Sequence, residues 1–116
     1  MMMKVVIKKV GQAPEVKEIK GELHEMQEIV GGYLEVIGLF GGIFCVLNEE
    51  GKLKGLPINF IFGRDFIVGN VFFCSVSGGD FSSLDEYQAD VIMRIFSVIE
   101  NNKRTWLKWI HVLHSN

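Results

Sequence analysis

Residues 66–75, FIVGNVFFCS, are the most apolar run in the chain and the starting point for its fold. Aromatic and β-branched side chains fill this run, and both kinds are common in strands. We therefore predict a single strand from Asp65 to Ser75.

Four stretches on the N-terminal side of this run also have the composition of strands. Met3–Val10 centres on three β-branched residues, and Glu15–Ile19 alternates polar and apolar side chains. Tyr33–Ile37 and Ile43–Leu47 are separated by a short glycine-rich link, which favours a hairpin. Residues 53–62 are too mixed in composition to predict an element.

Helical spacing first occurs from Leu23 onward, where apolar residues recur every three or four positions. The pair Gly31-Gly32 then predicts the end of this short helix. A second helix is predicted to begin at Ser83, the N-cap residue, with Glu86 as its capping-box partner. It runs to about Ile99.

A third helix is predicted over residues 105–114, after the interruption at 101–103. Together these elements predict an α+β domain with a mostly antiparallel sheet of about five strands. One short helix and one or two C-terminal helices pack on that sheet. The length of 116 residues fits a single domain over 1–116.

Composition excludes several classes of protein. Apolar residues make up 48% of the chain and the net charge is −2, so neither general disorder nor ordinary nucleic-acid binding is expected. No uninterrupted apolar run is long enough to span a membrane, and the N-terminus lacks a secretory signal. Cys45 and Cys74 lie in apolar runs, where buried free thiols in a reducing cytosol are expected and a disulfide is the alternative.

Catalytic motifs are missing from the sequence. His111 and His114 share a helical face, but a solvated helix end explains them better than a metal site does. The glycine pairs lack the Lys-Ser/Thr that completes a phosphate loop, and neither cysteine has a basic neighbour. We therefore expect no enzyme activity, no catalytic residue, no metal and no cofactor.

Two segments remain as candidates for binding. Asn48–Asn59 places amide, carboxylate and ammonium groups together, either for a small polar ligand or as a decorated turn. The C-terminal segment must bury an apolar face, either on its own sheet or against another subunit in a homodimer. The predicted interface residues of that segment are Trp106, Trp109, Ile110 and Leu113.

Four ordered motifs resemble one known family. They are 28–35, EIVGGYLE; 48–59, NEEGKLKGLPIN; 67–73, IVGNVFF; and 79–84, GDFSSL, preceded by APEV at 13–16. The chain is similar in these to the family called domain of unknown function 3846, over about residues 3–90. Residues 91–116 would then be an additional helical, Trp-rich segment.

The resemblance implies an accessory protein of phages, plasmids and their bacterial hosts, acting in the host cytoplasm. A non-enzymatic counter-defence role follows as the expectation: sequestration of a small polar ligand such as a host immune nucleotide, without membrane or direct nucleic-acid binding. Lys52 would meet a phosphate, and Asn48 and Asn59 would read a base or ribose edge. The expected ligand-binding residues are Asn48, Glu49, Lys52, Asn59 and Arg64.

Such a site needs a positively charged side chain in a concave surface. Lys52, Lys54 or Arg64 can supply that charge. The alternative function is an anti-CRISPR or another protein-targeted inhibitor that masks a host defence complex. Its anchors would be Trp106 and Trp109. Its acidic loops would compete for a basic groove through Glu49, Glu50, Asp80, Asp85 and Glu86.

Overall fold

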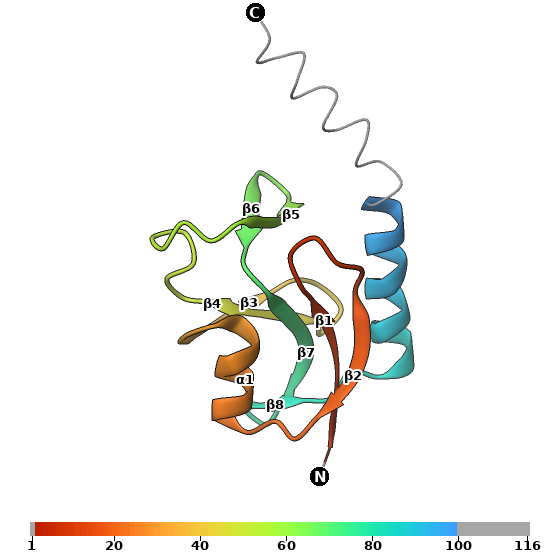
Figure 1. Cartoon of the computed structure of the whole chain (residues 1–116). Helices are drawn as coiled ribbons and strands as arrows, with labels where there is room; N and C mark the ends of the chain where they lie inside the picture. Colours follow the sequence, from red (N-terminus) through yellow and green to blue (C-terminus); the bar gives the residue numbers. More distant parts are fainter. Residues whose placement is uncertain (1, 100–116) are drawn as a thin grey trace, which may run out of the picture.

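A computed structural model describes residues 2–99 as an antiparallel sheet with a helix on each face. In this part of the chain the sheet has six strands, in the order β2-β1-β7-β4-β3, with β8 also paired to β7, and β5 and β6 form a separate hairpin (Figure 1). The elements are β1 (Met3–Lys8), β2 (Glu15–Ile19), α1 (Leu23–Val30), β3 (Leu34–Gly38), β4 (Phe44–Asn48), β5 (Ile58–Phe62), β6 (Asp65–Val68), β7 (Val71–Ser77), β8 (Asp80–Ser82) and a C-terminal helix over 86–99. The predicted α+β class is confirmed.

Strand β7 organises both halves of the core. Phe72 faces α1 and packs in a cluster with Val46 and Met26, whereas Phe73 faces the C-terminal helix and packs in a cluster with Phe96. Neighbouring residues point to opposite faces because side chains alternate along a strand. The apolar run 66–75 therefore supplies both cores, which is why it is apolar without alternation.

The prediction of one strand from Asp65 to Ser75 is wrong. Gly69 adopts a φ of +75°, which favours glycine, and it separates β6 from β7. Strand β6 then turns back on β5 through a two-residue link that begins at Gly63. Strands β5 and β8 were not predicted. The composition of 53–62 is too mixed to indicate β5, and the three residues of β8 are too few to give a pattern.

One predicted helix end is confirmed and one is corrected. Gly31 ends α1 with a φ of +80°, as predicted, and its N–H donates to the carbonyl oxygen of Gln27 at 2.8 Å. The predicted N-cap Ser83 is wrong: its Oγ instead accepts from the backbone N–H of Lys4 at 3.0 Å. Asp85 and Gln88 form the reciprocal capping bonds, at 2.7 and 2.9 Å.

The C-terminal predictions fall on residues outside 2–99. The predicted interface residues Trp106, Trp109, Ile110 and Leu113 lie there, as does the third helix. Among the described residues, no helix is long and apolar enough to cross a membrane.

Candidate functional site

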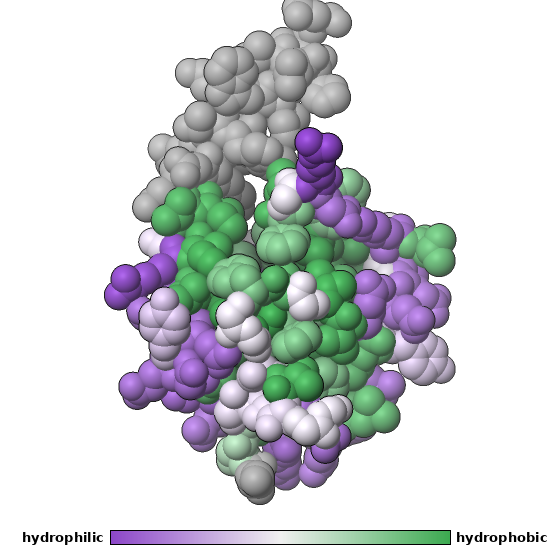
Figure 2. Space-filling view, turned by 180° about the vertical axis from the view of Figure 1, so that it is seen from behind, coloured by the Kyte–Doolittle hydropathy of each residue, from purple (hydrophilic) through white to green (hydrophobic). Residues whose placement is uncertain are grey.

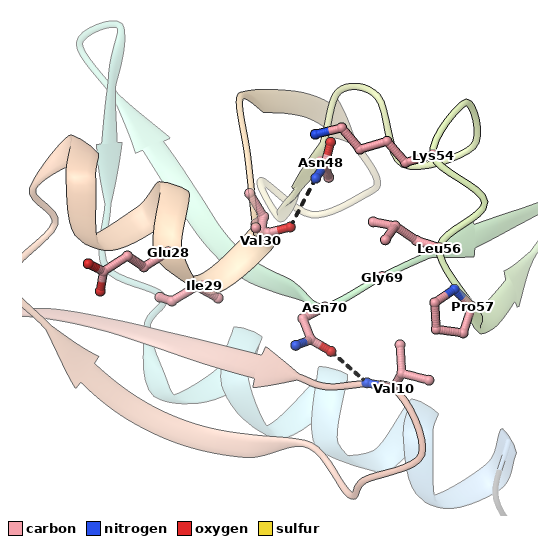
Figure 3. A pocket seen from close by; sticks show the side chains of 11 residues that line it. Val10, Glu28, Ile29, Val30, Asn48, Lys54, Leu56, Pro57, Gly69 and Asn70 are labelled. Carbon is pink, nitrogen blue, oxygen red and sulfur yellow. Dashed lines mark hydrogen bonds between the residues drawn. The ribbon is translucent and has the colours of Figure 1, made fainter.

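A pocket of about 280 Å³ opens between the end of α1, the loop that follows β4, and the link between β6 and β7 (Figure 3). Its walls are mostly apolar, with a few polar groups at defined places, which is the usual composition of a small-molecule site. Its volume is near the lower end of the range for such sites, so it suits a small ligand. The side chains shown around it are those of Val10, Glu28, Ile29, Val30, Asn48, Lys54, Leu56, Pro57 and Asn70.

Asn48 builds one wall from a buried position at the end of β4. Its Nδ2 donates to the carbonyl oxygen of Val30 at 3.3 Å, and its Oδ1 accepts from the backbone N–H of Glu50 at 2.8 Å. The first bond satisfies a carbonyl at the C-terminus of α1, and the second shapes the turn after β4. A β-carbon at Gly32 would lie 2.8 Å from this Nδ2, so glycine is needed there.

The loop from Gly51 to Pro57 builds the opposite wall around Leu56. A β-carbon at Gly69 would lie 2.9 Å from Leu56 Cδ1, and one at Gly51 would lie 2.8 Å from Val68 Cγ2. The N–H of Gly69 also donates to the carbonyl oxygen of Pro57 at 2.8 Å. These close approaches fold the motif 48–59 against the 67–73 motif and leave the pocket between them.

Two donors face the pocket without a protein partner in the described part of the chain. The exposed Lys54 forms no ion pair there, and no hydrogen bond engages Nδ2 of Asn70. The other end of the Asn70 amide is fixed, because its Oδ1 accepts from the N–H of Val10 at 2.9 Å (Figure 3). Glu28 does not neutralise Lys54: its carboxylate lies 3.3 Å from Nε2 of His24. An ammonium and an amide N–H therefore remain for an anionic or acceptor-rich ligand.

The structure brings only Asn48 of the predicted ligand residues into the lining of this pocket. Lys52 lies outside it, where its Nζ pairs with Asp65 and sits 4.9 Å from the centre of the Phe66 ring. Arg64 is exposed in the turn between β5 and β6, and Glu49 is exposed after β4. Asn59 binds Lys8 and Gly69 through all the polar atoms of its side chain.

The Lys52–Asp65 pair explains why Lys52 is held away from the pocket. The hydrogen bond from Lys52 and the N–H of Phe66 lower the pKa of Asp65 below its ordinary value, so the carboxylate stays charged opposite the ammonium. The cation that meets the pocket is Lys54, one of the three that the sequence offered. Asn70 was missed, although a polar residue inside the most apolar run was the signal that could have found it.

Cys45 and Cys74 are free and buried, which confirms the thiol prediction. Cys45 packs in the cluster beneath the C-terminal helix and Cys74 in the cluster beneath α1, so they face opposite sides of the sheet. Burial raises the pKa of each thiol to about 12, which leaves neither as a thiolate at neutral pH. Within residues 2–99, no cluster of three His, Cys, Asp or Glu side chains is placed to hold a metal.

Comparison with known families gives one match. The family model described as "Domain of unknown function (DUF3846)" matches residues 3–97, so the matched region includes most of the C-terminal helix. No curated protein and no solved structure matched the chain.

Proposed function

We propose that this chain, which belongs to the family described as domain of unknown function DUF3846, is a non-enzymatic binding protein. It sequesters a small anionic ligand of the nucleotide class. The pocket beside α1 is the binding site. Lys54 contacts a phosphate and Asn70 donates to an acceptor on the base or sugar.

One observation carries this proposal: an ammonium and an amide N–H without partners, among the described residues, share a pocket with apolar walls. A phosphate needs a cation or N–H donors, and a flat ring needs apolar contacts. Leu56, Pro57 and Ile29 supply those contacts, and Lys54 and Asn70 supply the donors. The pocket volume of about 280 Å³ favours a single nucleotide over a larger molecule.

Lys54 replaces Lys52 in this proposal for an electrostatic reason. Moving Lys52 to a ligand would break its pair with Asp65 and its contact with the Phe66 ring. Lys54 has no ion pair to lose within the described chain, and its loop is already fixed by the N–H of Lys54 donating to the carbonyl oxygen of Glu50 at 2.9 Å. Asn48 then acts by shaping the wall.

The biological setting of the proposal rests on the resemblance to small phage and plasmid proteins. In that setting the protein acts in the cytoplasm of an infected or plasmid-bearing bacterium and removes a nucleotide signal of host defence. The alternative, an inhibitor that masks a defence protein, has weaker support. Asp85, one of the acidic residues expected to compete for a basic groove, instead accepts the hydrogen bond that caps the C-terminal helix.

The test is to purify the full chain from bacteria in an active defence response, denature it, and identify released small molecules by mass spectrometry. We expect a nucleotide in a molar amount close to that of the protein. The released compound is then titrated back into the empty protein by calorimetry. Lys54→Ala should weaken its binding by about tenfold or more, as expected for a charge-assisted hydrogen bond.

Lys52→Ala is the matched control, because it removes an exposed lysine from the same loop but outside the pocket. It should bind the compound as the unsubstituted chain does. An empty protein that co-purifies with a defence complex would overturn sequestration in favour of masking. Equal weakening by both lysine variants would show a general charge effect and would contradict the assigned pocket.

A further inference from the structure

A second depression, lined by apolar side chains, lies on the other face of the molecule. It has a volume of about 130 Å³ and runs between the β5–β6 hairpin, the loop after β3 and the C-terminal helix. Its floor is an aromatic cluster in which the ring centres of Phe60 and Phe96 are 5.0 Å apart and those of Phe73 and Phe96 are 5.7 Å apart. The groove is part of the same core cluster that joins the C-terminal helix to the sheet.

The rim of this groove leaves large apolar side chains open to water. Phe40 is 47% exposed in the loop after β3, Phe62 is 40% exposed in β5, and Ile95 is 37% exposed in the C-terminal helix. Figure 2, the view from behind, shows hydrophobic side chains gathered over this face. Contiguous apolar surface of this kind marks a contact site, whereas isolated apolar residues need no such explanation.

The position of Ile99 points to an occupant of the groove. Ile99 lines the groove and is the last residue that the structure describes, and 17 further residues follow it in the sequence. Trp106 comes seven positions after Ile99, and a stretch of that length can span at most about 25 Å, which is enough to turn back onto the groove. Asn101 and Asn102 lie in this connection, and asparagine is common where a helix ends.

The sequence of the terminal segment complements the groove. Trp106, Trp109, Ile110 and Leu113 have the spacing of one helical face. A connection of about five residues is typical between two antiparallel helices. A tether this short also gives the segment a local concentration of roughly millimolar at its own groove, which favours this contact over one with a second molecule.

We propose that residues 105–113 dock in this groove of their own chain, with the face carrying Trp106 and Trp109 toward Phe62 and Ile95. The segment then covers the exposed aromatic floor and completes the core on this side of the sheet. This inference is independent of the ligand pocket, which lies beside α1 on the opposite face.

Tryptophan fluorescence tests the proposal directly, because Trp106 and Trp109 are the two tryptophans of the chain. We expect the full chain to emit at shorter wavelength than free tryptophan and to resist quenching by acrylamide, independently of protein concentration. Sedimentation should give the mass of a monomer throughout. Phe62→Ser and Ile95→Ser should each shift the emission to longer wavelength and increase quenching.

Leu53→Ser is the matched control, since Leu53 is 90% exposed and lies outside the groove. It should leave the emission unchanged, and far-ultraviolet circular dichroism checks that all three variants keep their fold. Tryptophan emission from the unsubstituted chain at the wavelength of free tryptophan in water would overturn the proposal. A blue-shifted emission that neither Phe62→Ser nor Ile95→Ser changes would also overturn it. A blue shift seen only when sedimentation gives the mass of a dimer would overturn it too, and would assign the segment to a groove on a second copy.

Discussion

Lys8 and Asn59 hydrogen-bond each other twice across 51 residues of sequence. Nζ of Lys8 donates to Oδ1 of Asn59 at 3.0 Å, and Nδ2 of Asn59 donates to the carbonyl oxygen of Lys8 at 2.8 Å. The same Nδ2 also donates to the carbonyl oxygen of Gly69 at 2.8 Å. Asn59 therefore ties the β5–β6 hairpin to the end of β1, and the pocket-forming link at Gly69 depends on this tie.

Asn59→Ala should lower the free energy of unfolding by about 1–3 kcal/mol, because it removes two donated bonds and one acceptor from a partly buried site. Urea denaturation followed by circular dichroism measures the change. Asn59→Asp should not restore this stability, since a carboxylate still accepts from Lys8 but cannot donate to the carbonyl oxygens of Lys8 and Gly69. Unchanged stability together with lost ligand binding would return Asn59 to the direct contact role that the sequence suggested.

The Lys52–Asp65 pair should make a small, salt-sensitive contribution to stability in acid. The pKa of Asp65 is lowered in the folded chain, so the contribution is present above the unfolded value of 3.8 and is lost as pH falls through the folded value. Lys52→Ala should raise the pKa of Asp65 back toward 3.8, with the N–H of Phe66 keeping part of the lowering. Carboxyl chemical shifts followed through an acid titration measure it, and an unmoved pKa would contradict the pair.

Asp85 should matter more than Ser83 for the C-terminal helix. Asp85→Ala removes the side-chain acceptor at the first turn and should cost about 1 kcal/mol of stability. Asp85→Asn is the control, because asparagine caps nearly as well and should retain most of that stability. Thermal unfolding compares the two. Equal losses in both variants would mean that the charge, acting on the helix dipole, outweighs the capping bond.

Cys45 and Cys74 should be inert toward a thiol reagent in the folded protein. Burial raises the pKa of each to about 12 from 9.0, so both are protonated at neutral pH and also shielded. Because the folded value is the higher one, the stability from the neutral thiols is complete below pH 9.0 and declines as pH rises toward about 12. Ellman's reagent with and without urea gives the test, and rapid reaction of the native chain would refute it.

Local patterns were enough to predict α1 with its end at Gly31, the β3–β4 hairpin and the buried thiols. They were not enough for the division of 65–75 into two strands, since the break depends on Gly69 packing against Leu56 from another loop. The helix cap moved from Ser83 to Asp85 for a similar reason: the Ser83 hydroxyl is engaged by Lys4, which is 79 residues distant in sequence.

The candidate site shows the same division more clearly. The sequence by itself determined the class of fold and marked the polar segment 48–59 as unusual, because periodicity and residue type act over a few neighbouring positions. Tertiary structure decided which polar groups remain available: Lys52 pairs with Asp65, Asn59 pairs with Lys8, and Lys54 lines the same pocket as Asn70. These arrangements involve residues far apart in the chain. The strength of a hydrogen bond or an ion pair depends on the distance between the atoms in space, which local sequence patterns do not fix.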